Sequence, residues 1–442
     1  MGRSRVFVLV ALAAIFLGGC NDDSSPVGST PPPAPPPPPP PPPAAVSTNA
    51  VILEWNRILT QNQGAGTLYS FRQYAILHIA MFDAVNSVKR QYKPYRIEVA
   101  SSTATSEEAA AAQAARDVMV ALYPAATADF DAALATRLAT LSQAEAMLGV
   151  DVGKQVAQAV LQWRAADGAA GPDPAYTPPA LPGLWQPTAP GQVAAGTRFI
   201  NILPFALLTP TQFLPAPPPL LNSAQYAENF QQVYDLGRVD SVVRTAEQTQ
   251  LARLVAGVNY GPGPFGLWNA VARGLAESRQ LSLIDTARLF ALMNASMHDG
   301  LQTSHTSKFI YHLWRPVTAI VNANDDKNDA TIADPTWVPL LTTPPYPSHA
   351  SNISCVGTSA SRALERALGS DQVPFSVTWT WTGAAGAGAD VTRQYSTLSQ
   401  LAHDAGMSRV YGGIHFEFEI TASAVSCTKV ADYVFSNYMQ PR

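Results

Sequence analysis

A long helical pattern runs through roughly residues 267–312 and narrows the choice of folds more than any other part of the chain. Apolar residues recur there at the spacing of a helix, and Pro316, which interrupts regular pairing, follows soon after. Earlier segments, among them residues 70–88, show the same periodicity. The sequence shows neither a solenoid-length repeat nor an alternation of strands with helices. It therefore predicts an all-α protein.

Shorter elements are also expected. Further helices are predicted at residues 105–122, 126–144, 151–164, 224–234 and 245–256. Thr105 and Glu108 have the spacing of a capping box at the start of the first of these. The alternating segment Phe375–Trp381 favours a strand, so the predicted fold contains at most a short β-hairpin.

Residues 1–20 have the pattern of a secretory signal, because their apolar run is too short to cross a membrane comfortably. The run ends in Leu-Gly-Gly-Cys, which resembles the lipobox of bacterial lipoproteins, in which the cysteine, here Cys20, is lipidated. A plain signal peptide cut nearby is the alternative. Residues 21–47 are rich in proline and predict a stiff, disordered tether. With Asn21 after the cysteine, we expect a lipoprotein anchored to the outer membrane and facing the periplasm.

The remainder divides into an N-terminal helical region, residues 48–280, and a C-terminal helical region, residues 281–442. The formal net charge of −4 does not indicate the excess of positive charge that is typical of nucleic-acid-binding proteins. No later stretch has the length and apolar character of a membrane span, so we expect membrane contact only through the N-terminal lipid. In an oxidising compartment, Cys355 and Cys427 either form a disulfide or remain two buried thiols.

Three stretches of the C-terminal region place cations and histidines among apolar residues. They are Lys308-x6-Arg315-Pro316, then Ser348-His349 after a proline-rich turn, then Arg409-x3-Gly413-x-His415. Singly, they are explained as surface charges over apolar neighbours, a helix N-cap and a core histidine. Together they supply three positive charges and a hydroxyl, which suit a tetrahedral oxyanion such as phosphate or vanadate.

In this order the three stretches resemble the signature of the superfamily that joins vanadium-dependent haloperoxidases and type-2 phosphatidic acid phosphatases (acid phosphatases). That signature reads K-x6-RP, PSGH and S-R-x3-G-x-H. The segments "WRPVTAI" and "WNRIL…FRQYAILHIAMFDAVN" resemble bacterial vanadium haloperoxidase-like proteins in particular. The resemblance covers nearly all of the chain after the tether and implies a multi-helix bundle of this type. The middle stretch departs from the signature, because no glycine separates Ser348 from His349.

The resemblance implies a haloperoxidase that oxidises halide with hydrogen peroxide at a histidine-bound vanadate, yielding hypohalous acid or halogenated organic molecules. The residues implied to bind vanadate are Lys308, Arg315, Ser348, Arg409 and His415. His415 would be the axial ligand of vanadium, His349 a general acid/base, and Lys308 a group that polarises bound peroxide. The implied partners are hydrogen peroxide, halide and a small organic acceptor, and relatives of this kind often form homodimers.

Two further residues and two other functions stay open. Asp299 is at a position where relatives often have an aspartate that holds an arginine in place. The alternative is an ordinary surface carboxylate. His305, where relatives usually have tryptophan, either lines the halide approach or points to solvent. The alternative function is a periplasmic acid phosphatase in which His415 forms a phosphohistidine. A third is a surface lipoprotein with weakened catalysis, because the missing glycine leaves the position of His349 open.

Overall fold

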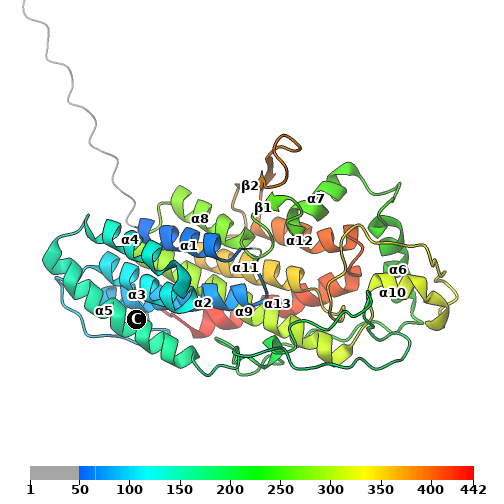
Figure 1. Cartoon of the computed structure of the whole chain (residues 1–442), viewed down its shortest axis with the longest axis horizontal. Helices are drawn as coiled ribbons and strands as arrows, with labels where there is room; N and C mark the ends of the chain where they lie inside the picture. The colour runs from blue at the N-terminus through cyan, green and yellow to red at the C-terminus, as the bar shows by residue number, and fades with distance from the viewer. Residues whose placement is uncertain (1–48, 65) are drawn as a thin grey trace, which may run out of the picture. The chain divides into compact units, whose positions relative to one another are not determined.

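The computed structural model describes residues 49–64 and 66–442. The signal, the lipidation site Cys20 and the tether lie outside these residues. The described residues belong to one compact unit, Val46–Arg442, which is shown in Figure 1. Both helical regions expected from the sequence, 48–280 and 281–442, are therefore parts of the same unit.

The described chain is mostly helical, which confirms the all-α prediction. Its α-helices are α1 (Ala50–Asn62), α2 (Tyr69–Lys89), α3 (Glu107–Leu122), α4 (Thr127–Leu138), α5 (Gln143–Arg164), α6 (Ala224–Gly237), α7 (Ala246–Ala256), α8 (Leu267–Ser278), α9 (Leu283–Tyr311), α10 (Pro316–Val321), α11 (Asn352–Leu368), α12 (Leu398–Tyr411) and α13 (Glu417–Asn437). Three 3-10 helices are η1 (Pro124–Ala126), η2 (Phe199–Asn201) and η3 (Ala323–Asp325).

A small antiparallel sheet accompanies the helices. Its strands are β1 (Tyr260–Gly261), β2 (Phe375–Trp381) and β3 (Val391–Tyr395), in the order β1-β2-β3. The strand predicted at 375–381 is confirmed, and β3 is the other arm of its hairpin, with Phe375 opposite Tyr395. The two-residue strand β1 is an addition to the hairpin that the sequence predicts.

The long pattern at 267–312 forms two helices rather than one. Gln280 has a φ of 49°, which interrupts a right-handed helix, and α9 starts afresh after it. The hydroxyl of Ser282 accepts a hydrogen bond from the Asp285 N–H at 3.2 Å and caps the new helix. Pro316 does not end this helix but occupies the first position of α10, where a missing N–H costs nothing.

The other helix boundaries differ by smaller amounts from the prediction. The N-cap of α3 is Ser106, whose hydroxyl accepts from the Ala109 N–H at 3.1 Å, rather than Thr105 of the expected capping box. The helix expected at 126–144 ends earlier, at Leu138, and the one expected at 151–164 begins earlier, at Gln143.

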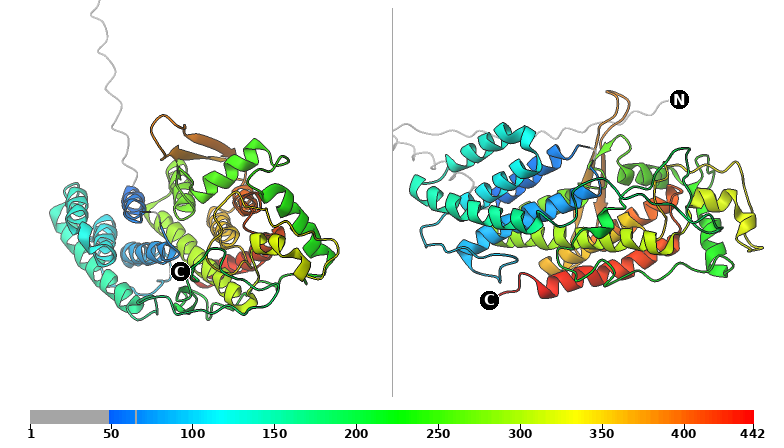
Figure 2. Two further views of the ribbon diagram at one scale, coloured as in Figure 1. Left: turned by 45° about the vertical axis from the view of Figure 1, so that its right-hand side comes forward. Right: turned by 60° about the horizontal axis from the view of Figure 1, so that its bottom comes forward.

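Helix α9 lies at the centre of the unit. Nearly every residue from Leu283 to Lys308 is buried, as expected for a helix that others cover on all sides. It packs against α2 of the N-terminal region and against α11 and α13 of the C-terminal region. Figure 2 shows these helices grouped around it. The largest hydrophobic core therefore contains residues from both sides of position 280.

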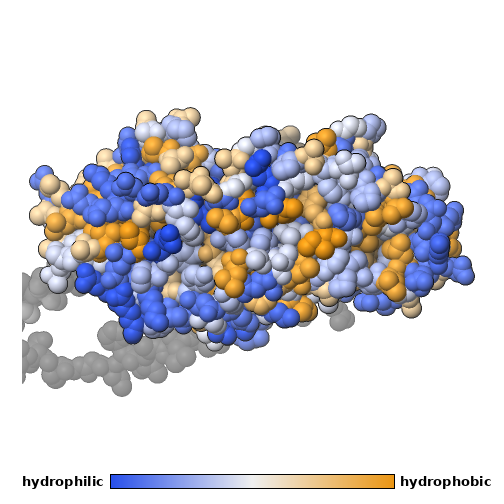
Figure 3. Space-filling model, turned by 90° about the horizontal axis from the view of Figure 1, so that it is seen from below, coloured by the Kyte–Doolittle hydropathy of each residue, from blue (hydrophilic) through white to orange (hydrophobic). Residues whose placement is uncertain are grey.

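The surface mixes apolar and polar side chains. On the face shown in Figure 3, the described hydrophobic residues form several separate patches with hydrophilic residues between them. Among the helices that the structure describes, none is both long enough and apolar enough to cross a membrane. The lipid anchor and the homodimer remain predictions.

A disulfide joins Cys355 in α11 to Cys427 in α13, with 5.4 Å between their Cα atoms. The structure thus contains the first of the two alternatives left open by the sequence. The bond spans a sequence separation of 72 residues. In the chain-entropy description of a loop of that length, reduction is expected to lower the free energy of unfolding by about 4 kcal/mol.

Denaturant unfolding with and without reductant tests this expectation. The double variant C355A/C427A serves as the control, because its unfolding should not respond to reductant. Equal midpoints for the reduced and oxidised wild-type protein would contradict the stabilising role of this bond.

His78 in α2 makes stability depend on pH. Its ring is fully buried and its Nε2 lies 2.8 Å from the Nδ2 of Asn56. Burial, assisted by the charge of Arg273, lowers the pKa of His78 to about 3. Since the unfolded state binds the proton near pH 6.5 and the folded state does not, stability is fully present above that pH and decreases as the pH falls towards 3.

We expect His78 to account for a loss of about 2 kcal/mol in the free energy of unfolding between pH 7 and pH 5. Urea unfolding at both pH values measures it. The variant His78→Gln, which keeps an acceptor for Asn56, should lose about 2 kcal/mol less than the wild type over this interval. Equal losses in the two proteins would contradict the prediction.

Candidate oxyanion site

Lys308 lies in the last turn of α9 and is fully buried. Its Nζ donates hydrogen bonds to the carbonyl oxygens of Ser348, at 2.7 Å, and Ala350. Burial, together with the nearby charge of Arg315, lowers the pKa of Lys308 well below its usual range. The amine therefore anchors the backbone of the middle stretch, and in its protonated form it has a third N–H for another acceptor.

Arg315 follows α9 in extended backbone and is also fully buried. Its Nε donates to the carbonyl of Tyr346 at 2.9 Å, and its Nη1 donates to the carbonyl of Ile414 at 2.8 Å. The same Nη1 lies 3.2 Å from the Nε2 of His415. Within the described residues, its Nη2 is buried and has no hydrogen-bond partner. Arg315 thus connects all three stretches and keeps one donor free.

Arg409 in α12 supplies the third cation. It is 7% exposed, and its Nη1 is buried without a partner among the described residues. Burial lowers the pKa of Arg409 to about 10, so the side chain stays charged at pH 7. A sharp turn follows, in which Gly413 has a φ of 75° and a Cβ would collide with the carbonyl oxygen of Gly237. This turn requires glycine. It directs the chain back so that His415 lies beside Arg315.

His415 is held by an acidic residue that the sequence analysis missed. Its Nδ1 lies 2.9 Å from the Oε2 of Glu419. Because a carboxylate accepts hydrogen bonds, Nδ1 is assigned the proton, and Nε2 carries the lone pair. Burial lowers the pKa of His415 to about 3 despite the carboxylate, so the ring is neutral at pH 7. A neutral imidazole with an unprotonated Nε2 is suited to bind a metal centre or to attack an electrophile.

Glu419 is fully buried in the first turn of α13. Its Oε1 accepts hydrogen bonds from the backbone N–H of Phe416 at 2.9 Å and from the hydroxyl of Ser348 at 2.8 Å. Burial raises the pKa of Glu419, but the hydrogen bond from the Nδ1–H of His415 outweighs this and holds the pKa below its usual range. The spacing of four residues from His415 in "HFEFE" is the signal by which it was recognisable.

Ser348 lies beside His415, with 3.4 Å between its Oγ and the Nδ1 of the ring. In this structure its hydroxyl proton is directed at Glu419. Ser348 is not a helix N-cap. Helix α11 begins at Asn352, and its N-cap is Ser351, whose hydroxyl accepts from the Ser354 N–H at 3.5 Å.

His349 is displaced from the cations. Its Nε2 lies 2.7 Å from the carbonyl of Ala216, to which it donates, and its Nδ1 is buried without a partner among the described residues. The ring lies near those of Tyr311 and Phe418, with centroids 5.3 and 6.1 Å away. Burial lowers the pKa of His349. Its side chain faces a neighbouring cleft.

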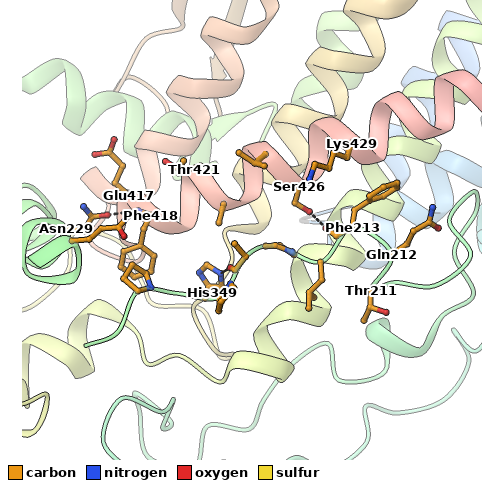
Figure 4. Close-up of a pocket in the computed structure, with 18 of the residues that line it drawn as sticks. Thr211, Gln212, Phe213, Asn229, His349, Glu417, Phe418, Thr421, Ser426 and Lys429 are labelled. Carbon is orange, nitrogen blue, oxygen red and sulfur yellow. Dashed lines mark hydrogen bonds between the residues drawn. The ribbon is translucent and has the colours of Figure 1, made fainter. Parts of the chain in front are cut away.

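That cleft has a volume of about 900 Å³ and is lined by His349, by the loop 211–219 and by the first half of α13. Figure 4 shows His349 in its middle, between Phe418 at one end and Phe213 at the other. The cleft therefore lies next to the buried cations, and the segment 348–349 separates the two.

Asp299 and His305 take positions different from those expected. Asp299 is a fully buried residue, not a surface carboxylate, and it does not hold an arginine of the site. It accepts hydrogen bonds from the backbone N–H groups of residues 205–207 at 2.7 to 2.9 Å and from His298. His305 is also fully buried rather than exposed, and its Nδ1 lies 3.1 Å from the Nδ2 of Asn352. Both residues fix loops around the site.

Tyr346 is a second residue that the sequence analysis missed. The centroid of its ring lies 5.4 Å from the Nζ of Lys308 and 5.0 Å from the Cζ of Arg315. The negative face of an aromatic ring attracts such cations. Its position two residues before Ser348 placed it near the site, but only the fold shows that its ring covers both cations.

The donor set fits a tetrahedral oxyanion. Lys308, Arg315 and Arg409 are buried, and Arg315 contacts His415. One guanidinium nitrogen of each arginine lacks a partner among the described residues, although buried polar groups are normally satisfied. An anion with several acceptor oxygens would satisfy them, as forked arginine donors commonly do for phosphate-like groups. Among the described residues, no group of three or more His, Cys, Asp or Glu side chains is arranged to hold a metal ion.

Comparison with known proteins identifies structures with a similar fold. Residues 288–442 match the family described as the VCPO second helical-bundle domain. The structure of the first bacterial vanadium-dependent iodoperoxidase is similar over 90% of this chain and 98% of that one, with 23% identity and a TM-score of 0.75.

Two bacterial vanadium-dependent chloroperoxidase structures are also similar, each at 15% identity. The holo form has a TM-score of 0.69 and covers 84% of this chain and 92% of its own. The apo form has a TM-score of 0.67 and covers 83% and 92%. The chain has no match among curated proteins. These similarities confirm the predicted resemblance and the predicted type of helical bundle.

Proposed function

We propose that this chain, which has the fold of the bacterial vanadium haloperoxidases, is an enzyme of that class and oxidises halide with hydrogen peroxide. The observation that carries the proposal is the pair of buried guanidinium donors without partners among the described residues, Nη2 of Arg315 and Nη1 of Arg409, together with the contact between Arg315 and the Nε2 of His415. In the net reaction, halide, hydrogen peroxide and a proton give hypohalous acid and water. The halide loses two electrons, and the O–O bond of the peroxide breaks.

The residues that would hold vanadate are Lys308, Arg315, Arg409 and His415. Bound vanadate would supply a Lewis-acidic centre that makes hydrogen peroxide electrophilic. The Nε2 of His415 is the atom available as its ligand, and Glu419 fixes the ring through Nδ1. The two arginines neutralise the charge of the oxyanion, and the remaining N–H of Lys308 is the donor that we expect to polarise the peroxide.

His349 acts in this proposal as a proton acceptor through its Nδ1. Its Nε2 donates to the carbonyl of Ala216, so the other nitrogen carries the lone pair. Because burial lowers the pKa of His349, the ring is neutral at pH 7 and can take up a proton. Because the ring lies at the cleft, we expect it to accept protons from molecules that enter through the cleft.

The second candidate, an acid phosphatase, is favoured by the bond between His415 and Glu419. A carboxylate at Nδ1 leaves Nε2 as a nucleophile that attacks phosphorus, which is the arrangement a phosphohistidine intermediate needs. The same cations would then bind the transferred phosphoryl group. The two functions differ in their response to vanadate, which is required by one and inhibits the other.

The cellular setting is part of the proposal. The N-terminal sequence supports export and lipidation at Cys20, with the enzyme body in the periplasm on the outer membrane. The disulfide between Cys355 and Cys427 fits an oxidising compartment. A homodimer remains part of the proposal by resemblance alone.

The test uses the compact unit from residue 46 onward, freed of vanadate and phosphate. Bromide and iodide oxidation with hydrogen peroxide is measured as orthovanadate is added, and hydrolysis of an aryl phosphate is measured without it. The haloperoxidase proposal predicts halide oxidation that saturates with vanadate. Hydrolysis that vanadate inhibits would establish the phosphatase, and inactivity in both assays would contradict both functions.

A further inference from the structure

A second cavity lies apart from the oxyanion site, between helix α7 and the small sheet. It measures about 740 Å³ and is lined by α7, by β1 and the end of β2, and by residues 340–342. Figure 1 shows α7 beside β1. None of the residues implied to bind vanadate lines this cavity, so the proposed function does not use it. Its volume is that of a small-molecule site.

Helix α7 forms one wall of the cavity with a single face. Four of its residues, three or four positions apart, line the space, which is the spacing of one side of a helix. They are Ala246, Thr249, Gln250 and Arg253. The opposite face of α7 is apolar and packs against α12. The packing of α7 therefore depends on its other face, and the lining face stays accessible from the cavity.

Arg253 is the one charged side chain in the lining of this cavity, as the described residues define it. It is exposed, and its guanidinium has neither an ion pair nor a hydrogen bond within the described chain. A second cation lies near, because burial and then the charge of Arg253 lower the pKa of Arg244. The cavity therefore favours an anion, and a guanidinium binds a carboxylate through two parallel hydrogen bonds.

The wall opposite Arg253 in the sheet is aromatic. Tyr260 and Trp381 are partners in the β1-β2 pair, and their rings meet edge to face with centroids 5.0 Å apart. The indole N–H of Trp381 donates to the carbonyl of Ala384 at 2.9 Å. The backbone of Gly383 and Gly388 packs against the indole, where a Cβ would collide with it. These contacts fix the aromatic wall in place.

The third wall, residues 340–342, is fixed through its backbone. The N–H of Leu341 donates to the carbonyl of Gly412 at 2.9 Å, and the N–H of Leu340 donates to the carbonyl of Gly237 at 2.9 Å. All three walls are thus held by contacts outside the cavity. The cavity is consequently preformed, which is the usual condition of a ligand site.

Amides and a hydroxyl group complete the lining. The side-chain amide of Asn259 has no hydrogen-bond partner in the part of the chain that the structure describes. The Oε1 of Gln250 accepts from Arg393 at 3.1 Å, which leaves its Nε2 as a donor. The hydroxyl of Thr342 also lines the space. Several such groups around an aromatic wall suit a molecule with many hydroxyl groups on an otherwise apolar ring.

We infer that this cavity binds a hexuronate, a sugar ring that carries a carboxylate. The carboxylate would pair with Arg253, and the hydroxyl groups would bind the amides of Asn259 and Gln250. The C–H bonds on one face of a sugar ring are weakly positive and pack against the negative face of an aromatic ring, here Tyr260 or Trp381. The inference does not depend on the proposed function, because the two sites share no residue.

Calorimetric titration of methyl glycosides tests the inference. The probes are the methyl glycosides of glucuronate, galacturonate and mannuronate, each compared with the neutral hexoside of the same ring. Phosphate buffer supplies a competitor for the oxyanion site. We expect at least one uronide to bind saturably and about tenfold or more tighter than its hexoside, because only the uronide pairs with Arg253. Equal affinities within every pair, or no uronide binding, would overturn the ligand class.

Two variants test the place of binding. Arg253→Gln should weaken uronide binding about tenfold and leave hexoside binding unchanged, whereas Ala246→Trp should weaken both by filling the cavity. Arg279→Gln and Ala132→Trp are the matched controls, because both residues are exposed on other parts of the surface and do not line this cavity. Wild-type uronide affinity in both cavity variants would overturn the site.

Benzoate tests whether the hydroxyl groups of the ligand matter, since it has the charge and a ring but no hydroxyl group. We expect it to bind about tenfold more weakly than the best uronide. Tighter binding of benzoate, lost in Arg253→Gln, would overturn the sugar and leave an aromatic acid in its place. Vanadate, halide and peroxide are absent from all these titrations, so a failure of halide oxidation stays distinct from their results.

Discussion

Replacement of His415 by alanine is expected to lower vanadate-dependent halide oxidation by about 10³-fold or more, because it removes the imidazole that binds vanadium in the proposed function. The Nε2 of His415 lies 3.2 Å from Arg315, and its Nδ1 is fixed by Glu419. No other side chain in the described chain shares this position between the arginines and the acidic residue. Steady-state bromide oxidation at saturating vanadate measures the effect.

His403→Ala is the control for this variant. His403 is an exposed histidine on α12, the helix that carries Arg409, so its loss should leave turnover unchanged. Circular dichroism and the unfolding midpoint establish that His415→Ala is folded, since Glu419 loses one of its partners in it. Full turnover by folded His415→Ala would remove this residue from the reaction centre.

Arg409→Met is expected to weaken orthovanadate binding by about 10²-fold, the value of a hydrogen bond between charged groups at a buried site. The same substitution should leave the free energy of unfolding unchanged or slightly raised. The reason is that the Nη1 of Arg409 is buried without a partner in the protein, and removing an unpaired buried charge costs no native interaction. Loss of affinity without loss of stability is the signature of a group kept for its ligand.

Titration calorimetry and urea unfolding measure the two quantities on the same preparation. Arg279→Met, a change at an exposed arginine after α8, is the control and should alter neither. Wild-type affinity in Arg409→Met would show that the guanidinium does not touch the oxyanion. A marked loss of stability would show that it holds the fold instead.

The sequence predicted the residue types of the site better than their contacts. The spacing of Lys308, Arg315, Arg409 and His415 was sufficient to propose an oxyanion site, and the structure brings Arg315 beside His415 and leaves donors free. It was not sufficient to predict that the amine of Lys308 binds two carbonyls of the middle stretch. Backbone carbonyls carry no sequence signal, so such contacts appear only with the fold.

Two misses have different physical reasons. Glu419 was recognisable from its spacing to His415, but its second role, binding Phe416 and Ser348, depends on where α13 starts. Asp299 was expected near an arginine and instead binds backbone N–H groups of residues 205–207. That loop is separated from Asp299 by more than ninety residues, a distance over which the sequence pattern specifies no contact.

The helical layout was predictable where periodicity was strong, as for α2 and for the alternating strand β2. The break between α8 and α9 was missed because apolar spacing continues across it. Its signal was local, a serine at 282 three residues before Asp285, which is typical of a helix start. The apolar periodicity over many residues predicts one continuous helix, whereas the serine at 282 alone indicates a new helix start, and the prediction followed the periodicity.

Titration of orthovanadate into the vanadate-free compact unit is the decisive measurement. If the buried cations and His415 form an oxyanion site, binding will saturate at one vanadate per chain, inorganic phosphate will compete with it, and Arg409→Met will weaken it. Failure of the folded wild-type protein to bind either oxyanion would contradict the oxyanion site and, with it, the proposed haloperoxidase.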